Sequence, residues 1–349
     1  MTITNAYAAI SAISPLSLYP IERRDTGIHD VQIEILYCGI CHSDVHQARN
    51  EWGGSKYPMV PGHEIVGKVT SVGAQVTKFK TGDLVGVGCF IDSCRTCHSC
   101  LAGEEQYCDQ GMNSTYNSFE KDRVTLTQGG YSTGIVVDEN YVLRISDKLH
   151  LPGVAPLLCA GITTYSPLRF WKVGPGKRVA VIGLGGLGHM GVKIASAMGA
   201  EVTVHSTHPA KEADARRMGA HHFVLSTDDA IMKTQRQHFD FILNTVSAKH
   251  DYKRFLHLLA LNGTMVLVGV PPEAPPVAAN ILIGRRRTLA GSLIGGIRET
   301  QEMLEFCAEH NIVSDVEIIP IQQVNEAYER LIKADVKYRF VIDLASLKN

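Results

Sequence analysis

The stretch VAVIGLGGLGHMGV, residues 179–192, decides the fold class of this chain. An apolar run leads into three glycines in G-x-G-x-x-G spacing, and an apolar helical pattern follows them. A strand before such glycines and a helix after them are typical of a dinucleotide-binding turn. The first glycine permits the tight turn, the second lets a pyrophosphate approach the backbone, and the third lets helix and strand pack closely. The alternative is a glycine-rich strand–helix corner without a ligand, and the context favours the cofactor site.

The residues after this turn decide which dinucleotide fits. The predicted cofactor turn comprises Gly183, Gly185, Gly186, Leu187 and Gly188. An NAD site places an acidic residue about 20 positions further on, to bind the ribose 2′-hydroxyl. The second strand ends in VTVHSTHPAK, where Ser206, Thr207 and Lys211 stand and no acid occurs before Glu212. Two hydroxyls and a cation suit a 2′-phosphate, so we predict NADP(H). Ser206 or Thr207 could also cap a helix, with Lys211 solvated, and both interpretations can hold at once.

The pattern around the turn separates the chain into two parts. From residue 178 buried strands alternate with helices, which indicates βαβ units and a parallel sheet. The first 150 residues form short strands broken by glycines instead, and a helix–strand pattern resumes after about residue 297. We predict an α/β protein with a doubly wound Rossmann domain over residues 159–296. Residues 1–158 and 297–349 would form a β-rich second domain.

Composition limits the classes of function. The formal net charge is −1 without a basic run, which argues against a nucleic-acid or membrane-surface role. No apolar run reaches the roughly 18 residues that span a bilayer. The N-terminal sequence lacks the pattern of a signal peptide, so we expect a cytoplasmic protein. In a reducing compartment, clustered cysteines among the nine are expected to be metal ligands rather than disulfides.

One loop carries four of these cysteines. The sequence SCRTCHSCLAGEEQYC gives the spacing C-x2-C-x2-C-x7-C, formed by Cys94, Cys97, Cys100 and Cys108. Four thiolates on one loop make a closed tetrahedral zinc site that holds a lobe together. An iron–sulfur cluster is the alternative, but the bacterial cluster pattern ends in C-x3-C-P. We therefore predict a structural zinc ion.

A second, open metal site is suggested by scattered residues. YCGICHSDVHQ, residues 37–47, contains the C-x-x-C pair Cys38 and Cys41, which invites a redox interpretation. His63 and Glu64 follow a Pro-Gly turn, and Cys159 lies where the two parts of the chain meet. A Cys2His zinc site with water in the fourth position would suit a catalytic centre. Spacing alone does not assemble these residues.

The motifs together carry a resemblance to a known family. CGICHSD, GHEIVGKVTSVG, the four-cysteine loop, PLLCAGITTY and GLGGLGHMGVK follow one another as in zinc-dependent medium-chain alcohol dehydrogenases. The resemblance runs from about residue 30 to the C-terminal RFVID. CHSDVHQARNEWG and GSLIGGIRETQEML resemble the cinnamyl-alcohol-dehydrogenase-like branch, which includes bacterial NADPH-dependent aldehyde reductases. The resemblance implies that the β-rich part is a GroES-like catalytic domain and that the protein is at least a homodimer.

The resemblance also assigns roles to residues. Cys41, His63 and Cys159 would bind the catalytic zinc, which gives about two zinc ions per chain with the structural one. Glu64 would be a carboxylate able to replace water on the metal, and Asp44 would fix the His63 ring through its other nitrogen.

Proton transfer and cofactor contacts are assigned in the same way. Ser43 would relay the proton to and from the substrate oxygen, and His46 would pass it to solvent through the cofactor ribose. His42 and Arg339 match positions that contact the cofactor phosphates, and Thr163 matches one near the nicotinamide.

The expected function is reversible reduction of aldehydes to primary alcohols with NADP(H) and zinc. A broad range of aromatic and aliphatic aldehydes or alcohols is the expected small-molecule partner. A zinc polyol dehydrogenase is an alternative that the NADP-type strand end and the CHSD segment disfavour. A zinc-free quinone reductase is disfavoured by the two cysteine constellations. A zinc- and NADPH-binding structural or sensor protein is the alternative outside enzymes, although a complete proton relay would serve no purpose there.

Overall fold

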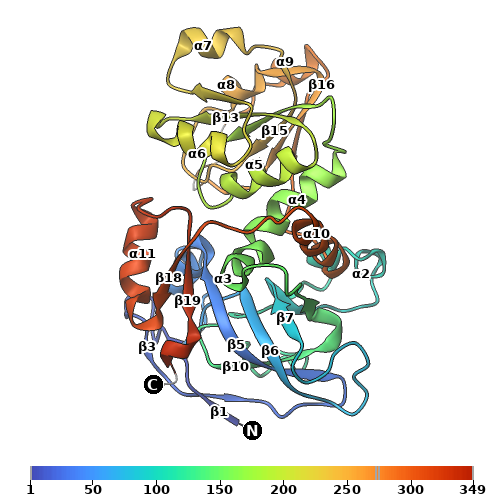
Figure 1. The fold of residues 1–349 in the computed structure, drawn as a ribbon, viewed down its shortest axis with the longest axis vertical. Helices are drawn as coiled ribbons and strands as arrows, with labels where there is room; N and C mark the ends of the chain where they lie inside the picture. Colours follow the sequence, from blue (N-terminus) through green and yellow to red (C-terminus); the bar gives the residue numbers. More distant parts are fainter. Residues whose placement is uncertain (1, 272, 274–275, 348–349) are drawn as a thin grey trace. The chain divides into compact units, whose positions relative to one another are not determined.

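The computed structural model describes residues 2–271, 273 and 276–347, which fold into two compact units (Figure 1). Unit 1 comprises Met1–Cys159 and Gly295–Asn349, and unit 2 comprises Ala160–Ile294. The predicted boundaries, after residues 158 and 296, stand one and two residues away from these. The difference matters at Cys159, which belongs to unit 1 and not to the cofactor-binding part.

Unit 2 is built on a six-stranded parallel sheet of order β14-β13-β12-β15-β16-β17. Its strands are β12 (Arg178–Ile182), β13 (Glu201–Ser206), β14 (His222–Leu225), β15 (Phe239–Asn244), β16 (Leu259–Leu267) and β17 (Thr288–Gly291). Its helices are α4 (Ala160–Phe170), α5 (Gly188–Ala197), η4 (Pro209–Lys211), α6 (Glu212–Arg217), α7 (Asp229–Thr234), α8 (Tyr252–Leu256) and α9 (Ala279–Ile283). The strand order runs outward in both directions from β12, as in a doubly wound fold. The predicted Rossmann sheet is therefore confirmed.

The core of unit 2 explains why these strands are apolar along their whole length. Phe239, Ile242, Leu256 and Met265 are fully buried in one cluster that joins β15 and β16 to α8. A sheet covered on both faces buries successive residues instead of alternate ones. Each such side chain contributes about 1.5–3 kcal/mol by leaving water.

His205 on β13 is a polar exception within this core. Its side chain is 1% exposed, and neither ring nitrogen has a hydrogen-bond partner among the described residues. Its ring meets Phe239 and Phe255 edge-on, with centroids 5.5 and 6.4 Å away. Burial lowers the pKa of His205 to about 3, so the native state holds a neutral imidazole.

Replacing His205 with phenylalanine will increase the free energy of unfolding at pH 5 by about 2 kcal/mol more than at pH 8. Below about pH 6.5 the unfolded wild type binds a proton at this histidine, whereas the native state does not until about pH 3. Wild-type stability therefore falls as the pH drops through this window, and the variant lacks that loss. Urea unfolding of both proteins at the two pH values measures the difference. An equal effect of the substitution at pH 5 and pH 8 would contradict the prediction.

Unit 1 is built on a larger sheet that is antiparallel except at one edge. Along the sheet the order is β11-β7-β6-β5-β19-β18, and β10 also pairs with β5. The strands are β5 (Asp30–Ile40), β6 (Ile65–Val72), β7 (Leu84–Val87), β10 (Gly134–Asp138), β11 (Leu143–Arg144), β18 (Val316–Pro320) and β19 (Arg339–Asp343). The C-terminal β19 lies beside β5, with Phe340 opposite Ile40 (Figure 1). Strand β19 thus joins a sheet that is formed mostly by strands from residues 30–144.

Shorter elements surround this sheet. The small strand pairs are β1 (Thr2–Thr4) with β4 (Ile21–Arg23), β2 (Tyr7–Ala8) with β3 (Ser17–Leu18), and β8 (Phe90–Asp92) with β9 (Asn113–Ser114). The α-helices are α1 (His42–Ala48), α2 (His98–Ala102), α3 (Leu151–Val154), α10 (Ile297–Glu309) and α11 (Val324–Ile332). The 3-10 helices are η1 (Glu105–Tyr107), η2 (Glu139–Tyr141), η3 (Ala155–Leu158), η5 (Ile321–Gln323) and η6 (Leu344–Leu347).

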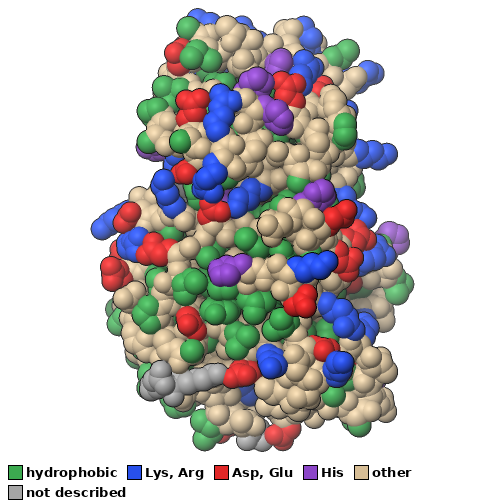
Figure 2. All heavy atoms as spheres, in the orientation of Figure 1, with side chains coloured by type: hydrophobic (Ala, Val, Ile, Leu, Met, Phe, Trp, Pro, Cys, Tyr) green, Lys and Arg blue, Asp and Glu red, His purple; other side chains and the backbone are tan. Residues whose placement is uncertain are grey.

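Acidic and basic side chains are interspersed on the visible face of both units, without a single-sign field (Figure 2). Among the described residues, each helix is too short or too polar to cross a bilayer.

Candidate active site and metal-binding lobe

The first candidate site lies where the end of β5 meets the start of β6. These strands pair antiparallel, with Cys38 opposite Ile65. Cys41 directly follows β5, while His63 and Glu64 directly precede β6. Because an antiparallel pair brings the end of one strand next to the start of the other, these three side chains meet.

Cys159 joins the group from the end of η3. One ligand atom each from Cys41, His63, Glu64 and Cys159 lies within 4.8 Å of the other three. Zinc binds thiolate at about 2.3 Å and imidazole at about 2.0–2.1 Å in a tetrahedron, so the four atoms need only small shifts to bind one ion. A hydrogen bond between the two thiols lowers the pKa of Cys41 well below its ordinary value and raises that of Cys159. The residues fit a zinc ion, and their assignment as its ligands stays a prediction.

Asp44 is buried beside this group and holds two of its members. Its Oδ2 accepts the Cys41 backbone N–H at 2.8 Å. Its Oδ1 lies 3.1 Å from His63 Nδ1 and accepts the Gly62 backbone N–H at 3.1 Å. The bond to Cys41 also completes the capping box of α1. Asp44 therefore caps a helix and orients His63, which leaves the Nε2 atom of His63 for a metal.

Three buried tyrosines from separate segments lie close enough to Asp44 for its charge to act on them. The hydroxyl of Tyr131 donates to Asp44 Oδ2 at 3.4 Å, and the Tyr116 ring stacks on His63 with centroids 5.9 Å apart. Burial, followed by the negative charge of Asp44, raises the pKa of Tyr116, Tyr131 and Tyr328 well above the ordinary value. The hydroxyls thus stay protonated next to the carboxylate. No spacing in the sequence links residues 116, 131 and 328, so these neighbours of Asp44 were not predicted.

Replacing Asp44 with asparagine will lower the zinc affinity of this site about 10–100-fold. The amide keeps the size of the side chain but lacks the negative charge that holds His63. Its NH2 group also replaces one acceptor oxygen, although the groups around Asp44 are hydrogen-bond donors. Competition with a chromophoric chelator measures the affinity. Tyr131→Phe is the matched variant, with a smaller effect because it removes one of several donors. An unchanged affinity in Asp44→Asn would rule out the positioning role.

Glu64 and Arg339 form a buried ion pair at this site. Arg339 Nη2 donates to Glu64 Oε1, while Glu64 Oε2 has no partner among the described residues. A Cβ on Gly39 would lie 1.9 Å from that Oε2, so only glycine leaves room for it. Burial raises the pKa of Glu64 to about 7, although Arg339 opposes the shift. The unpartnered oxygen suits the predicted role of Glu64 as a carboxylate that can replace water on the metal. The Arg339 side chain is only 4% exposed, and its contact with the cofactor stays a prediction.

The remaining residues predicted in this loop lie on α1. Ser43 Oγ lies 3.6 Å from Cys41 Sγ, beside the metal group. His46 faces outward, where Nδ1 pairs with Glu51 and the ring stacks on Trp52 at 4.9 Å. His42, the first residue of the helix, is exposed. Ser43 therefore lies toward the metal group and His46 toward solvent. The proton relay between them stays a prediction.

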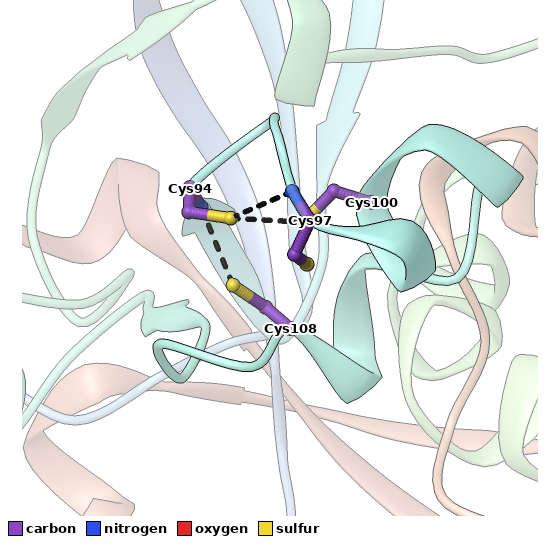
Figure 3. A group of neighbouring side chains, drawn as sticks. All are labelled: Cys94, Cys97, Cys100 and Cys108. Carbon is purple, nitrogen blue, oxygen red and sulfur yellow. Dashed lines mark hydrogen bonds between the residues drawn. The ribbon is translucent and has the colours of Figure 1, made fainter.

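The second site is the four-cysteine loop, whose thiols converge around α2 and η1 (Figure 3). The ligand atoms of Cys94, Cys97, Cys100 and Cys108 lie within 4.8 Å of one another. Cys94 Sγ is 3.8 Å from Cys100 Sγ, and it accepts the Cys97 backbone N–H at 3.3 Å. Backbone N–H groups that point at this sulfur lower the pKa of Cys94 to about 6, which favours the thiolate. The set fits a closed zinc site.

The four-cysteine loop also contacts α10. Glu105 Oε2 accepts the Ile297 backbone N–H at 3.1 Å at the helix start, and Arg298 donates to the Ala102 carbonyl at 2.8 Å. A Cβ on Gly296 would lie 2.0 Å from the Gly103 carbonyl oxygen, so the two backbones touch. The loop therefore holds the segment that re-enters unit 1.

In unit 2 the three glycines of the cofactor turn have the different backbone angle and surrounding space that the motif requires of each. Gly183 has φ +88, which permits the turn. A Cβ at Gly185 would meet nothing within 4 Å, whereas one at Gly188 would lie 2.0 Å from the Gly183 carbonyl oxygen. Gly185 thus leaves open space and Gly188 lets the helix pack on the turn. Gly186 and Leu187 complete the turn, and α5 begins without a side-chain cap, so its N–H groups remain for phosphates.

The residues predicted to select NADP(H) lie beside this turn. Lys211 Nζ donates to the carbonyl of Leu184 at 2.7 Å, and Ser206 ends β13, the neighbour of β12. Ser206 Oγ accepts the His208 backbone N–H, while Thr207 is exposed. Neither hydroxyl caps a helix, because α6 and η4 begin after Lys211 and His208 without side-chain caps. Thr163 is buried in the first turn of α4.

Comparison with known proteins finds related families for both parts of the chain. Residues 27–147 match the family model of the alcohol dehydrogenase GroES-like domain, and residues 186–309 match that of the zinc-binding dehydrogenase. NADP-dependent alcohol dehydrogenase C of Mycobacterium tuberculosis is 57% identical over 347 residues, which are 99% of this chain and 100% of that protein. Aldehyde reductase YahK of Escherichia coli is 56% identical over 345 residues, or 98% of each chain.

A solved structure extends the likeness to the fold. The cinnamyl alcohol dehydrogenase SbCAD4 of Sorghum bicolor superposes with a TM-score of 0.95 at 47% identity, over 99% of this chain and 98% of that one. The resemblance that the sequence motifs indicate is therefore confirmed over nearly the whole length. The chain belongs to the zinc-dependent medium-chain alcohol dehydrogenase family of oxidoreductases, with a GroES-like domain in unit 1 and the Rossmann sheet in unit 2.

Proposed function

We propose that this protein reduces aldehydes reversibly to primary alcohols with NADP(H) and a catalytic zinc ion, over a broad range of aromatic and aliphatic substrates. The observation that carries the proposal is the group of Cys41, His63 and Cys159, with the unpartnered carboxylate oxygen of Glu64 beside it. A zinc ion bound there supplies Lewis-acid polarisation of the carbonyl oxygen. The two thiolates of Cys41 and Cys159 and the neutral imidazole of His63 would balance the charge of a divalent ion held there.

The side chains of this group divide the remaining work. Asp44 holds His63 and the Cys41 backbone in place, so the ligand positions are fixed before substrate arrives. Ser43, next to Cys41, hands a proton to the substrate oxygen. His46, half-exposed and paired with Glu51, exchanges that proton with solvent.

The cofactor site supports NADP(H). NADP(H) supplies the hydride and takes it back in the reverse direction. The open space at Gly185 and the uncapped start of α5 suit the pyrophosphate. Ser206, Thr207 and Lys211 suit the 2′-phosphate, and the Mycobacterium tuberculosis relative is named an NADP-dependent enzyme.

Lys211 tests the cofactor preference directly. We expect NADPH to exceed NADH in kcat/KM, and Lys211→Ala to lower the NADPH value about 10–100-fold by removing a charged contact to the phosphate. The NADH value will change little, because NADH lacks that phosphate. Lys233→Ala, an exposed lysine on α7, serves as the control. Equal kcat/KM values for NADH and NADPH in the wild type would refute the role of Ser206, Thr207 and Lys211.

A panel of aldehydes, primary alcohols and polyols, scored by kcat/KM with zinc-loaded protein, tests the activity. Turnover of several aldehydes by NADPH supports the proposal, and a preference for polyols supports the polyol dehydrogenase. Absence of turnover across the whole panel supports a zinc- and NADPH-binding sensor or structural protein.

The proposal includes a homodimer and a cytoplasmic location. β17 is an edge strand of its sheet, and Ile283 and Leu293 on either side of it in sequence are exposed. Such an edge invites pairing with a second copy, which light scattering will test. None of the nine cysteines, all of which lie in the described part of the chain, forms a disulfide, as suits a reducing compartment.

A further inference from the structure

We propose that Cys89 and Cys159 form a redox-sensitive pair of thiols. A hydroperoxide oxidises the two thiols to a disulfide, and Cys159 is then lost as a ligand of the catalytic metal group. The inference rests on the proposed function, because it concerns the regulation of the same site. Cys89 is a thiol beside that group that is not one of its ligand atoms.

Cys89 lies against the residue that directly precedes Cys159. It lies in the link between β7 and β8, and its Sγ points at the carbonyl of Leu158, 3.7 Å away. Leu158 directly precedes Cys159. A Cβ on the neighbouring Gly88 would lie 3.2 Å from that same carbonyl oxygen, so the two segments are in close contact.

The two thiols also interact. Side-chain hydrogen bonding with Cys41 and with Cys89 raises the pKa of the Cys159 thiol. Cys41 belongs to the group of ligand atoms that lie within 4.8 Å of one another, whereas Cys89 does not. A metal held by Cys41, His63 and Cys159 therefore leaves Cys89 as a free thiol against one of its ligands.

Exposure separates Cys89 from the other cysteines that bind no predicted metal. Cys38 and Cys307 are fully buried, and Cys307 packs on Met303 in the interior of α10. Cys89 is partly exposed, so a small oxidant has access to it. Cys89 follows the end of β7, as Cys41 follows the end of β5.

The chemistry balances with a hydroperoxide as the oxidant. One sulfur attacks the peroxide, forms an S–O bond and becomes a sulfenic acid, while the O–O bond breaks and the released oxygen leaves as water or alcohol. The second thiol then attacks that sulfur, and the hydroxyl leaves as water with the proton of the thiol. The two sulfurs lose two electrons in total and the peroxide gains them. A dithiol reverses the step by exchange.

The experiment uses the zinc-loaded full chain and hydrogen peroxide. After oxidation, free thiols are alkylated, disulfides are mapped by peptide mass spectrometry, and released zinc is measured with a chromophoric chelator. We expect a Cys89–Cys159 disulfide and loss of about one zinc per chain, both reversed by dithiothreitol and added zinc. We expect Cys89→Ser to release this zinc about tenfold more slowly.

Matched variants and the disulfide map of the wild type together test the Cys89–Cys159 pair. Cys307→Ala removes a buried thiol that belongs to neither group of ligand atoms, and it should behave as the wild type. If Cys89→Ser folds poorly, Cys89→Ala and the wild-type disulfide map still decide the question. A Cys41–Cys159 disulfide, or an irreversible sulfinic acid at Cys159, overturns the proposal. Protein that binds zinc only in the four-cysteine loop would refute the proposed function, while the disulfide map would still judge the cysteine pair.

Discussion

Cys41→Ala will lower kcat/KM for aldehyde reduction by more than about a thousandfold, since Lewis-acid stabilisation of the developing alkoxide is worth several kcal/mol. The substitution removes one of two thiolates from the metal group while Asp44 keeps its bonds to His63 and to the backbone of residue 41. Metal content should fall from about two zinc ions per chain to about one. Steady-state kinetics with NADPH and metal analysis of the same preparation measure both effects.

Cys38→Ala is the matched control for this prediction. Cys38 is the other half of the apparent C-x-x-C pair, but it is fully buried and packs near Gly62 and Gly130. We expect Cys38→Ala to keep both zinc ions and most activity, at a modest cost in stability. If Cys38→Ala and Cys41→Ala lose activity equally, the two cysteines act together and the ligand assignment of Cys41 is wrong.

Cys97→Ser will lower the melting temperature by about 10 °C, which for a chain of 349 residues corresponds to about 7 kcal/mol. Structural zinc contributes folding free energy directly, and zinc-finger peptides gain about 10–16 kcal/mol from it. Without the ion, the four thiols lose their common partner, and the contacts of Glu105 and Ala102 with α10 lose their support. Differential scanning calorimetry and metal analysis measure the effect.

The control for this variant lies one residue away. His98 is exposed and outside the ligand group, so His98→Ala should keep the melting temperature and both metal ions. The Cys97→Ser protein should retain the zinc at Cys41, and activity should persist below its lowered melting temperature. Simultaneous loss of both zinc ions in Cys97→Ser would contradict the independence of the two sites.

Sequence patterns predicted what depends on the local backbone. The glycine turn is the clearest case, because the φ of Gly183, the open space at Gly185 and the close packing of Gly188 all follow from missing side chains. The four-cysteine loop is equally local, since its ligands lie within fifteen residues. The boundary near Cys159 was less defined, because an apolar helical pattern runs across it from residue 155 to 171.

The catalytic group could not be assembled from spacing. Cys41 and His63 meet because β5 and β6 pair antiparallel, and Cys159 arrives from a helical segment 118 positions after Cys41. The resemblance to a family named these residues, but it did not name the tyrosines around Asp44 or the contact of Cys89 with Cys159. Such contacts depend on how distant segments pack, which no local pattern records.

The sequence by itself determined the cofactor turn, the closed four-cysteine set and the alternation of strands and helices that gives the doubly wound sheet. These features follow from backbone conformation and from residues close in sequence. Only the tertiary structure decided that the C-x-x-C pair separates, with Cys38 in the core and Cys41 in the metal group. A strand turns successive side chains to opposite sides, and the residue that a side chain meets there is set by strand pairing and packing over the whole unit.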